Sequence, residues 1–220
     1  MIEEEYYKYI DSHSSRQMAE ALDWLTKQTH IRTNHARMLS GAVQGELLGM
    51  LVRIINAKNV LELGTFTGYS AICLAGALPC DGHLDTLELN DELEDLILEG
   101  FDKAGISDKV SLHLGDCKKT IEKIRPDILA GEKPMYDIVY IDANKREYCS
   151  YYNLVFDILR PGGILLADNV LWDGKVLQNP LPQDAQTQEI ARFNEMAAND
   201  PRVETVILPL RDGLSLIRKK

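Results

Sequence analysis

The sequence is short of positive charge and has few cysteines, and each shortage excludes a class of protein. Its 220 residues include 34 acidic and 24 basic side chains, which gives a net charge of −10 at pH 7. This acidic balance argues against broad binding to nucleic acid or to an anionic membrane surface. The cysteines show no CxxC spacing, so we expect free thiols in a reducing compartment at Cys73, Cys80, Cys117 and Cys149.

Long apolar runs are also missing. No stretch approaches the roughly 18 apolar residues that cross a membrane, and the N-terminus (MIEEE) is acidic where a signal peptide is basic. We therefore expect a cytoplasmic protein without a membrane partner. Neither repeats nor a linker-like segment interrupt the chain, which predicts one domain over residues 1–220. Helices over residues 1–56 should cover the site, and residues 57–220 should form the sheet core.

Short apolar runs alternate with helical patterns from residue 60 onward, which is typical of a Rossmann-like α/β fold with helices on both faces of the sheet. The predicted strands occupy residues 60–63, 83–88, 110–114, 136–141, 164–167, 203–210 and 214–217. A turn is predicted at residues 161–163 (PGG), and a hairpin is predicted at residues 211–213 (RDG). The last strand should therefore be antiparallel in a mostly parallel sheet.

The first predicted strand ends in the run LELGTFTGYS, residues 61–70, where a glycine turn leads into a helix. Gly64 lets a ligand lie close to the backbone because it has no Cβ, and the helix end offers N–H donors to an anion. A dinucleotide fingerprint needs a third glycine, whereas only Gly64 and Gly68 are present here. Pyrophosphate binding is therefore disfavoured at this turn.

Glu88 ends the second predicted strand, at the same edge of the sheet. In nucleotide-binding sheets a carboxylate at that position accepts hydrogen bonds from the hydroxyls of a ribose. A ribose site without a pyrophosphate site favours S-adenosylmethionine as the ligand. The alternative is that Glu88 is only the polar end of a strand, because short glycine motifs are weak signals.

Two further strands end in side chains that carry oxygen. Asp142 follows the strand at 136–141, and Asp168 and Asn169 follow the strand at 164–167. Because ligands bind at the carboxyl ends of parallel strands, these side chains should gather at one edge. An all-oxygen set suits Mg²⁺, Mn²⁺ or Ca²⁺. The alternative is that both aspartates cap the turn or helix that follows them.

Lys145 lies shortly after Asp142 and is a candidate general base. A divalent cation and a sulfonium nearby would disfavour its charged form, whereas the alternative is an exposed lysine at a helix start. Trp172, in the loop after Asn169, is a candidate wall for a flat substrate. Other aromatic residues nearby are interpreted as core or interface: Tyr148, Tyr151 and Tyr152.

Several ordered motifs resemble those of the cation-dependent class I O-methyltransferases, which include the catechol and caffeoyl-CoA O-methyltransferases. The matching segments are LELGTFTGYS (61–70), IDANK (141–145), DNVLWDGKV (168–176), DPRVE (200–204) and DG (212–213). The similarity runs from about residue 38 to the C-terminus. It implies a seven-stranded sheet with an antiparallel last strand, S-adenosylmethionine and Mg²⁺ as cofactors, and commonly a homodimer.

The resemblance also implies a role for each matching residue. The cofactor-binding residues would be Ser40, Glu62, Gly64, Thr65 and Ser70 at the methionine end, Glu88 at the ribose, Asp116 and Cys117 at the adenine, and Asp142. The metal ligands would be Asp142, Asp168 and Asn169, and the catalytic residues Lys145 and Asp142. In the implied reaction two neighbouring acceptor oxygens chelate the metal, Lys145 takes a proton, and the oxygen attacks the sulfonium methyl.

The sequence therefore predicts a divalent-cation-dependent O-methyltransferase that acts on a small vicinal dihydroxy aromatic such as a catechol. The alternatives are methylation of a hydroxylated tRNA base, a non-catalytic S-adenosylmethionine-binding module, and a nicotinamide-dependent oxidoreductase. The one locally basic stretch, residues 30–37, is interpreted as a solvated linker, with a lid or a tRNA contact as the alternative. Asn144 replaces an acid common in the plant enzymes, and residues 177–186 match no member closely, so the resemblance transfers no acceptor.

Overall fold

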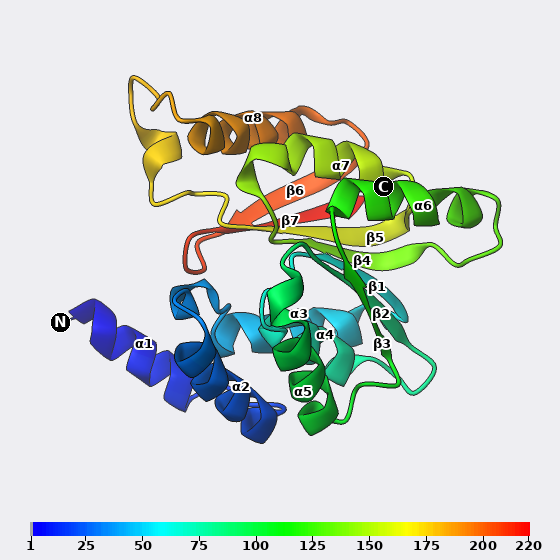
Figure 1. The fold of residues 1–220 in the computed structure, drawn as a ribbon. Coiled ribbons are helices and arrows are strands. Elements are labelled where there is room, and N and C mark those ends of the chain that lie inside the picture. Colours follow the sequence, from blue (N-terminus) through cyan, green and yellow to red (C-terminus); the bar gives the residue numbers. More distant parts are fainter. Residues whose placement is uncertain (1) are drawn as a thin grey trace. The chain divides into compact units, whose positions relative to one another are not determined.

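The computed structural model describes residues 2–220, with the side chains of residues 2–4 and 7 outside that description. Within this range, seven strands form one sheet in the order β3-β2-β1-β4-β5-β7-β6 (Figure 1). Their bounds are Asn59–Leu63 (β1), His83–Glu88 (β2), Val110–Leu114 (β3), Tyr136–Ile141 (β4), Leu159–Asp168 (β5), Val203–Leu208 (β6) and Leu214–Lys219 (β7). Strand β4 pairs in parallel with β1 and β5, whereas β7 runs antiparallel to β5 and β6. The predicted seven-stranded, mostly parallel sheet with an antiparallel last strand is confirmed.

Helices fill the connections, as the strand–helix alternation predicted. The α-helices are Ile2–Ser12 (α1), Ala19–Arg32 (α2), Ala42–Ile54 (α3), Tyr69–Ala77 (α4), Glu94–Ala104 (α5), Cys117–Leu129 (α6), Tyr148–Phe156 (α7) and Ala185–Asn199 (α8). Single 3₁₀ turns occur at Ala36–Met38 (η1), Asp91–Leu93 (η2), Lys145–Glu147 (η3) and Lys175–Leu177 (η4). None of the described helices combines the length and the apolar character that crossing a membrane requires.

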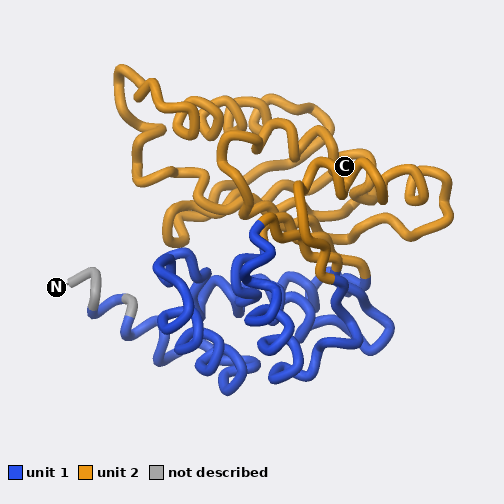
Figure 2. The backbone as a smooth tube through the Cα atoms, in the orientation of Figure 1, with its two compact units in different colours: residues 1–58, 65–84, 90–111 blue, residues 59–64, 85–89, 112–220 orange. Residues whose placement is uncertain are grey.

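The chain forms two compact units, which are described separately (Figure 2). The first unit contains residues 1–58, 65–84 and 90–111, and the second contains residues 59–64, 85–89 and 112–220. Helices and no strand occupy the described part of residues 1–56, as predicted. The single domain over residues 1–220, with its first 56 residues covering the site, stays a prediction.

The first unit is built from helices α2 to α5. Its core contains Leu25, Leu48, Ile72 and Phe101, each almost fully buried. Helices α3 and α4 approach closely because Gly45 faces Cys73; a Cβ at position 45 would lie 2.6 Å from the Cys73 Sγ atom. This unit therefore depends on a small residue at the crossing of the two helices.

The second unit places a continuous apolar core under helices α6, α7 and α8, which Figure 1 shows along β4, β5 and β7. The register explains how the sheet supplies one face of that core. One row across the strands contains Leu61, Val139 and Leu165, and the next contains Leu63, Ile141 and Ala167. All of these side chains are buried in the same cluster. Strands that are buried this completely have nearly continuous apolar sequences, which is why they could be predicted from the sequence.

The start of β5 differs from the prediction. Residues 161–163 were expected to form a turn before a strand at 164–167, whereas β5 begins at Leu159 and includes them. The pairing with β4 shifts there, because the step from Tyr136 to Ile138 faces the step from Leu159 to Ile164. Extra residues are thus accommodated as a bulge, and Gly162 supplies the positive φ of 74° that the bend requires. The predicted turn at residues 161–163 is therefore wrong, because these residues belong to the bulged start of β5.

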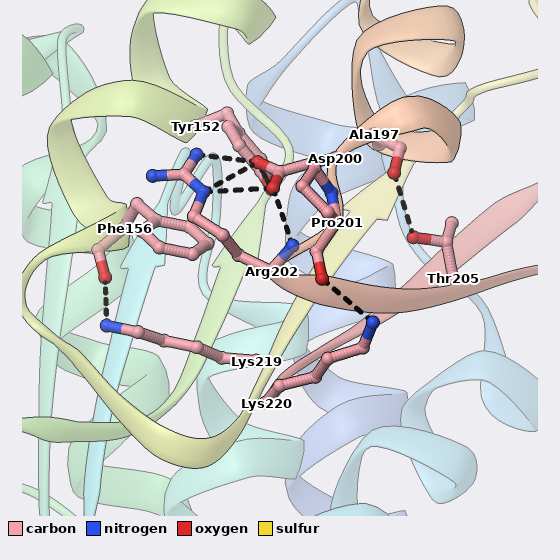
Figure 3. A network of polar contacts seen from close by, with 9 residues as sticks. All are labelled: Tyr152, Phe156, Ala197, Asp200, Pro201, Arg202, Thr205, Lys219 and Lys220. Carbon is pink, nitrogen blue, oxygen red and sulfur yellow. Dashed lines mark hydrogen bonds and ion pairs between the residues drawn. The ribbon is translucent and has the colours of Figure 1, made fainter.

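The C-terminal end of α7 is fastened to β7 by Lys219 (Figure 3). The Lys219 ammonium donates hydrogen bonds of 2.7 Å to the carbonyl oxygens of Phe156 and Leu159. It also lies 4.6 Å from the centre of the Phe156 ring, and the Arg202 guanidinium lies 3.9 Å from that ring. Carbonyls at a helix end lack partners within the helix, so a cation there stabilises the terminus.

A second contact fastens the middle of α7 to the segment before β6 (Figure 3). Tyr152 donates a 3.0 Å hydrogen bond to Asp200 Oδ2, and Arg202 binds the same carboxylate with its Nε and Nη2 atoms. These charge-assisted bonds lower the pKa of Asp200, so the carboxylate stays ionised. The motif DPRVE therefore has a structural explanation as an anchor for α7.

Gly64, directly after β1, has no room for a side chain. Its φ of +97° favours glycine, and a Cβ there would lie 2.5 Å from the backbone oxygen of Asp142. The Gly64 N–H also donates a 2.9 Å hydrogen bond to the Leu87 carbonyl at the end of β2. Backbone crowding of this kind cannot be relieved by rotating a side chain.

The first prediction concerns Lys219. Lys219→Met should lower the free energy of unfolding by about 1–3 kcal/mol, because two backbone carbonyls lose a charged donor. Arg218→Met, one residue earlier on the same strand, removes only an exposed ion pair with Glu204 and should cost less than about 1 kcal/mol. Urea unfolding of both variants measures the difference, and equal losses would contradict the role of Lys219.

The second prediction separates backbone strain from steric clash. Gly64→Ala should destabilise the chain by more than about 3 kcal/mol, because strain at a positive φ adds to the clash with Asp142. Gly105→Ala is the matched control, since Gly105 also has a positive φ, of 64°, but has nothing within 4 Å of the added Cβ. It should lose only about 1 kcal/mol in urea unfolding. A smaller loss at position 64 than at position 105 would refute the clash.

Candidate functional site

The carboxyl ends of β1, β2, β4 and β5 meet in the second unit, as expected for parallel strands. Asp142 directly follows β4, and its N–H donates a 2.8 Å hydrogen bond to the Leu63 carbonyl at the end of β1. Asp168 is the last residue of β5 and is only 2% exposed. Two carboxylates therefore lie at neighbouring strand ends, where the sequence predicted them.

Lys145 points its side chain at this edge from the 3₁₀ turn η3. The Lys145 Nζ atom donates a 2.6 Å hydrogen bond to Asp142 Oδ1 and a 2.7 Å hydrogen bond to the Tyr148 hydroxyl. The Lys145 and Asp142 side chains are only 11% and 20% exposed. An ion pair this sheltered is screened little by solvent, so its geometry is much better fixed than that of a surface pair.

Two buried tyrosines connect the Asp168 region to the same cluster. The Tyr148 hydroxyl lies 2.9 Å from the Asp168 carbonyl oxygen and 3.2 Å from the Ile141 carbonyl oxygen. Tyr140 donates a 3.1 Å hydrogen bond to Asp168 Oδ2, and the Asn169 N–H donates one of 2.9 Å to Asp168 Oδ1. Burial raises the pKa of both phenols well above the ordinary value, so both remain hydrogen-bond donors.

The electrostatics of the cluster favour a bound cation. The pKa of Asp142 is raised to about 6, chiefly by burial and also by the negative charge of Asp168, while Lys145 and Arg211 oppose the shift. Two carboxylates held this close in a sheltered place repel each other, and a divalent cation removes that repulsion. The predicted donor set, two carboxylates and the amide of Asn169, consists of the hard oxygen ligands that Mg²⁺ takes.

The predicted metal ligands differ from a cluster of histidine, cysteine and carboxylate side chains. Among the side chains that the structure describes, no three His, Cys, Asp or Glu residues are grouped so that they could hold a metal ion. The predicted set has two carboxylates, and its third ligand is the amide of Asn169. The remaining coordination positions would fall to water or substrate, as is common for Mg²⁺.

The predicted adenosine end also comes together in the second unit. Glu88 ends β2, and its carbonyl accepts a 2.7 Å hydrogen bond from Gly115, directly before Asp116. Asp116 caps helix α6 by accepting a 3.0 Å hydrogen bond from the Lys119 N–H. Burial, aided by the charges of Glu88 and Asp116, raises the pKa of Cys117 to about 12. Cys117 is therefore an inert thiol, which leaves its backbone as the group available to a ligand.

Glu62 is buried on β1, and its position is fixed by a neighbouring strand. Its Oε2 atom accepts a 2.5 Å hydrogen bond from the Thr86 hydroxyl on β2. Gly64 follows two residues later, with its N–H bonded to the Leu87 carbonyl. Glu62 and Gly64 thus belong to the same sheet edge as Asp142, whose backbone lies directly against Gly64.

The remaining predicted cofactor residues belong to the first unit. Ser40 is buried just before α3, Thr65 is buried in the turn after Gly64, and Ser70 is buried in the first turn of α4. In the same turn Thr67 shares a 2.9 Å hydrogen bond with Thr29 of α2. The structure therefore buries these small polar side chains, and their contact with a cofactor stays a prediction.

Trp172 lies in a conformationally unusual loop after β5. Asn169, Trp172 and Asp173 have positive φ angles of 58°, 50° and 51°, which residues other than glycine rarely adopt. Trp172 is partly buried, and its indole Nε1 has no hydrogen-bond partner among the described residues. Lys175 lies 5.6 Å from the ring centre. Strain of this kind often marks a functional loop, so the candidate role of Trp172 is retained.

Two residues of the cluster were missed by the sequence analysis. Tyr148 was interpreted as core, although its i+3 spacing from Lys145 across a 3₁₀ turn places both side chains on one face. Asp212, in the β6–β7 hairpin, accepts a 2.7 Å hydrogen bond from the Asp173 N–H. Burial raises the pKa of Asp212, and the charge of Asp168 contributes. Spacing was thus an available signal for Tyr148, whereas Asp212 needed the folded hairpin.

Comparison with known proteins identifies the family. A family model described as "O-methyltransferase" matches residues 11–220. Caffeoyl-CoA O-methyltransferase 1 from Eucalyptus globulus is 35% identical over 190 residues, which span 83% of this chain and 75% of that protein. Catechol O-methyltransferase domain-containing protein 1 from Mus musculus is 41% identical over 176 residues, which span 80% of this chain and 66% of that protein.

A solved structure shows the same fold. The O-methyltransferase TomG from Streptomyces achromogenes, in complex with SAM, is similar with a TM-score of 0.86 and 29% sequence identity. The similarity covers 97% of this chain and 95% of that chain. The fold, the motifs and the family match agree, and the chain therefore belongs to the O-methyltransferase family as an S-adenosylmethionine-dependent enzyme.

Proposed function

We propose that this enzyme needs a divalent cation and transfers the methyl group to one hydroxyl of a small vicinal dihydroxy aromatic acceptor. The observation that carries the proposal is the sheltered ion pair of Lys145 with Asp142, beside the second carboxylate of Asp168. A base, a cation-binding pair of carboxylates and a flanking aromatic residue, Trp172, are what methylation of a catechol-like hydroxyl requires.

In this proposal the cofactor lies along the carboxyl edge of the sheet. The residues assigned to it are Ser40, Glu62, Gly64, Thr65, Ser70, Glu88, Asp116, Cys117 and Asp142. Glu88 would accept hydrogen bonds from the ribose hydroxyls, as carboxylates at this position do in other nucleotide-binding sheets. Gly64 would lie beside the cofactor, and its missing Cβ lets the Asp142 backbone approach the same turn.

Asp142, Asp168 and Asn169 would hold the cation, which as a Lewis acid makes an acceptor hydroxyl more acidic. The residues of this chain then have separate tasks. Lys145 takes the hydroxyl proton as a neutral amine, a form that a cation held at Asp142 and the sulfonium would favour over the ammonium. Trp172 packs against the ring of the acceptor and excludes water. The carboxylates would hold the acceptor oxygen only through the cation, which would keep it in place for attack on the methyl carbon of the sulfonium, with S-adenosylhomocysteine as the leaving group.

The structure and the comparisons favour this proposal over the three alternative functions that the sequence left open. The basic stretch at 30–37 was the only support for tRNA, yet Arg32 is engaged by Glu99 at 2.8 Å. A non-catalytic binding module and a nicotinamide-dependent oxidoreductase do not fit membership of an S-adenosylmethionine-dependent enzyme family. A small-molecule acceptor is also supported by the caffeoyl-CoA enzymes among the relatives. The homodimer is part of the proposal only through the family resemblance.

The third prediction tests the reaction. With labelled S-adenosylmethionine and Mg²⁺, caffeic acid should be methylated, and EDTA should lower the rate by at least about 100-fold. The matched acceptor p-coumaric acid has a single ring hydroxyl and cannot chelate, so it should be methylated at least about 100-fold more slowly. Chelator-insensitive transfer, or equal rates on the two acids, would refute the cation mechanism.

The fourth prediction follows from the raised pKa of Asp142. In EDTA the folded state holds this proton more tightly than the unfolded state, so stability is lost as the pH rises through about 6. Asp142→Asn cannot lose a proton there, so its stability relative to wild type should rise from about pH 4 to about pH 7.5, by at most about 3 kcal/mol.

Urea unfolding at both pH values measures this difference. Adding Mg²⁺ at the higher pH should stabilise the wild-type chain and leave Asp142→Asn unchanged, because a ligand that binds only the folded state shifts the unfolding equilibrium. A pH-independent difference between the two proteins would contradict the shift of Asp142. Equal stabilisation of both by Mg²⁺ would contradict its assignment as a ligand.

A further inference from the structure

We propose that Tyr148 is a positioning residue for the base: its hydroxyl holds the Lys145 nitrogen against the backbone that carries the cation-binding carboxylates. The inference deepens the proposed function and rests on it for the role of Lys145. Tyr148 is not assigned to the cofactor, the cation or the acceptor. Its task is to fix where the nitrogen lies when it takes the proton.

The Tyr148 hydroxyl contacts Lys145 and the backbone of both strands that end in the carboxylates. Its oxygen lies 2.7 Å from Lys145 Nζ, 2.9 Å from the Asp168 carbonyl oxygen and 3.2 Å from the Ile141 carbonyl oxygen. Ile141 is the residue before Asp142, and Asp168 is itself a proposed ligand. One hydroxyl therefore ties the nitrogen to the ends of both strands that carry the carboxylates.

Tyr148 supplies what Asp142 cannot supply during the reaction. The Asp142 carboxylate is the other partner of Lys145, but in the proposed function it also binds the cation. The Tyr148 hydroxyl directs its own proton at the backbone carbonyls, so it accepts a hydrogen bond from Lys145. The amine and the ammonium both carry N–H groups, so this contact persists before and after the proton moves and leaves the lone pair of the amine free to take it. The lysine side chain is a flexible chain of four carbons. If one of its two hydrogen-bond partners is lost, the position of its nitrogen is therefore poorly defined.

The ring of Tyr148 is fixed independently of its hydroxyl. The residue is fully buried at the start of α7, and its ring meets Phe193 of α8 edge-on at 5.5 Å. A phenylalanine at this position would keep that packing and lose only the hydrogen bonds. Tyr148→Phe thus removes the proposed function of the side chain while preserving its role in the core.

The same helix offers a matched control in Tyr152. It is 1% exposed, and its ring also meets Phe193 at an angle, at 6.1 Å. Its hydroxyl is directed instead at Asp200, in the network that anchors α7 (Figure 3). Tyr152→Phe therefore deletes an equivalent buried hydroxyl that does not contact Lys145.

The fifth prediction is a split between kcat and KM. Tyr148→Phe should lower kcat by roughly 10-fold or more, because the base is misplaced in the transition state. The KM for S-adenosylmethionine and the Kd for S-adenosylhomocysteine should stay within about twofold of wild type, since neither depends on Lys145. Tyr152→Phe should keep kcat within about twofold. A Tyr148→Phe enzyme with wild-type kcat, or equal losses in both variants, would overturn the proposal.

A second measurement needs no turnover. In EDTA, reductive methylation with formaldehyde and cyanoborohydride should modify Lys145 several-fold faster in Tyr148→Phe than in wild type or Tyr152→Phe. Peptide mass spectrometry follows the rate, and Lys118, which is held by Glu147 at 2.5 Å, is the internal control. Unchanged labelling of Lys145, or equal acceleration at Lys118, would overturn the proposal. If wild type methylates no acceptor, the proposed function fails, while the labelling result still decides whether Tyr148 holds Lys145.

Discussion

The ion pair between Lys145 and Asp142, which is largely shielded from solvent, is the interaction on which the arrangement of the strand ends in the second unit depends. Lys145 and Asp142 are sheltered together, with the second carboxylate of Asp168 acting on the pair. Removing such charges from water costs free energy, and Lys145 and Arg211 offset it only in part, since the pKa of Asp142 is still raised. Natural sequences seldom retain such a surplus of buried negative charge unless it serves binding or catalysis.

The fold keeps this cluster in place from two sides. Parallel strands deliver the carboxylates, because β4 and β5 end side by side and their last residues share one edge. Helix α7 delivers Tyr148 at its N-terminal end, while Lys219 and the Asp200–Arg202 pair hold the other parts of the same helix. These contacts hold α7 on the sheet, and the hydroxyl of Tyr148 then fixes the Lys145 nitrogen locally.

Family membership and acceptor choice depend on different parts of the chain. The motifs shared with the relatives lie at strand ends and turns, where the chemistry of S-adenosylmethionine transfer constrains both backbone and side chains. The shared motif DNVLWDGKV runs to residue 176 and includes Trp172 and Asp173, whereas residues 177–186, which follow it, match no member of the family closely. Loops on a rigid scaffold are where enzymes of one fold vary their substrates.

The sequence by itself determined the strands, the antiparallel hairpin and the residue types at each strand end. Apolar runs such as residues 136–141 can only be buried strands in this context, and the RDG turn at 211–213 has the chemistry of a hairpin. Polar residues placed directly after such runs must then meet at one edge, which is why Asp142 and Asp168 could be named in advance.

Only the tertiary structure decided which groups touch. A tyrosine at helical spacing predicts a buried core residue, and Tyr148 is buried. Its hydroxyl, however, contacts backbone carbonyls that lie 7 and 20 residues away in the chain. The PGG segment likewise reads as a turn, and its pairing with β4 turned it into a bulge of β5. Both outcomes depend on contacts between distant segments, and local periodicity carries no information about such contacts. The sequence therefore named the reactive groups, and the packing of α7 on the sheet determined how they are oriented.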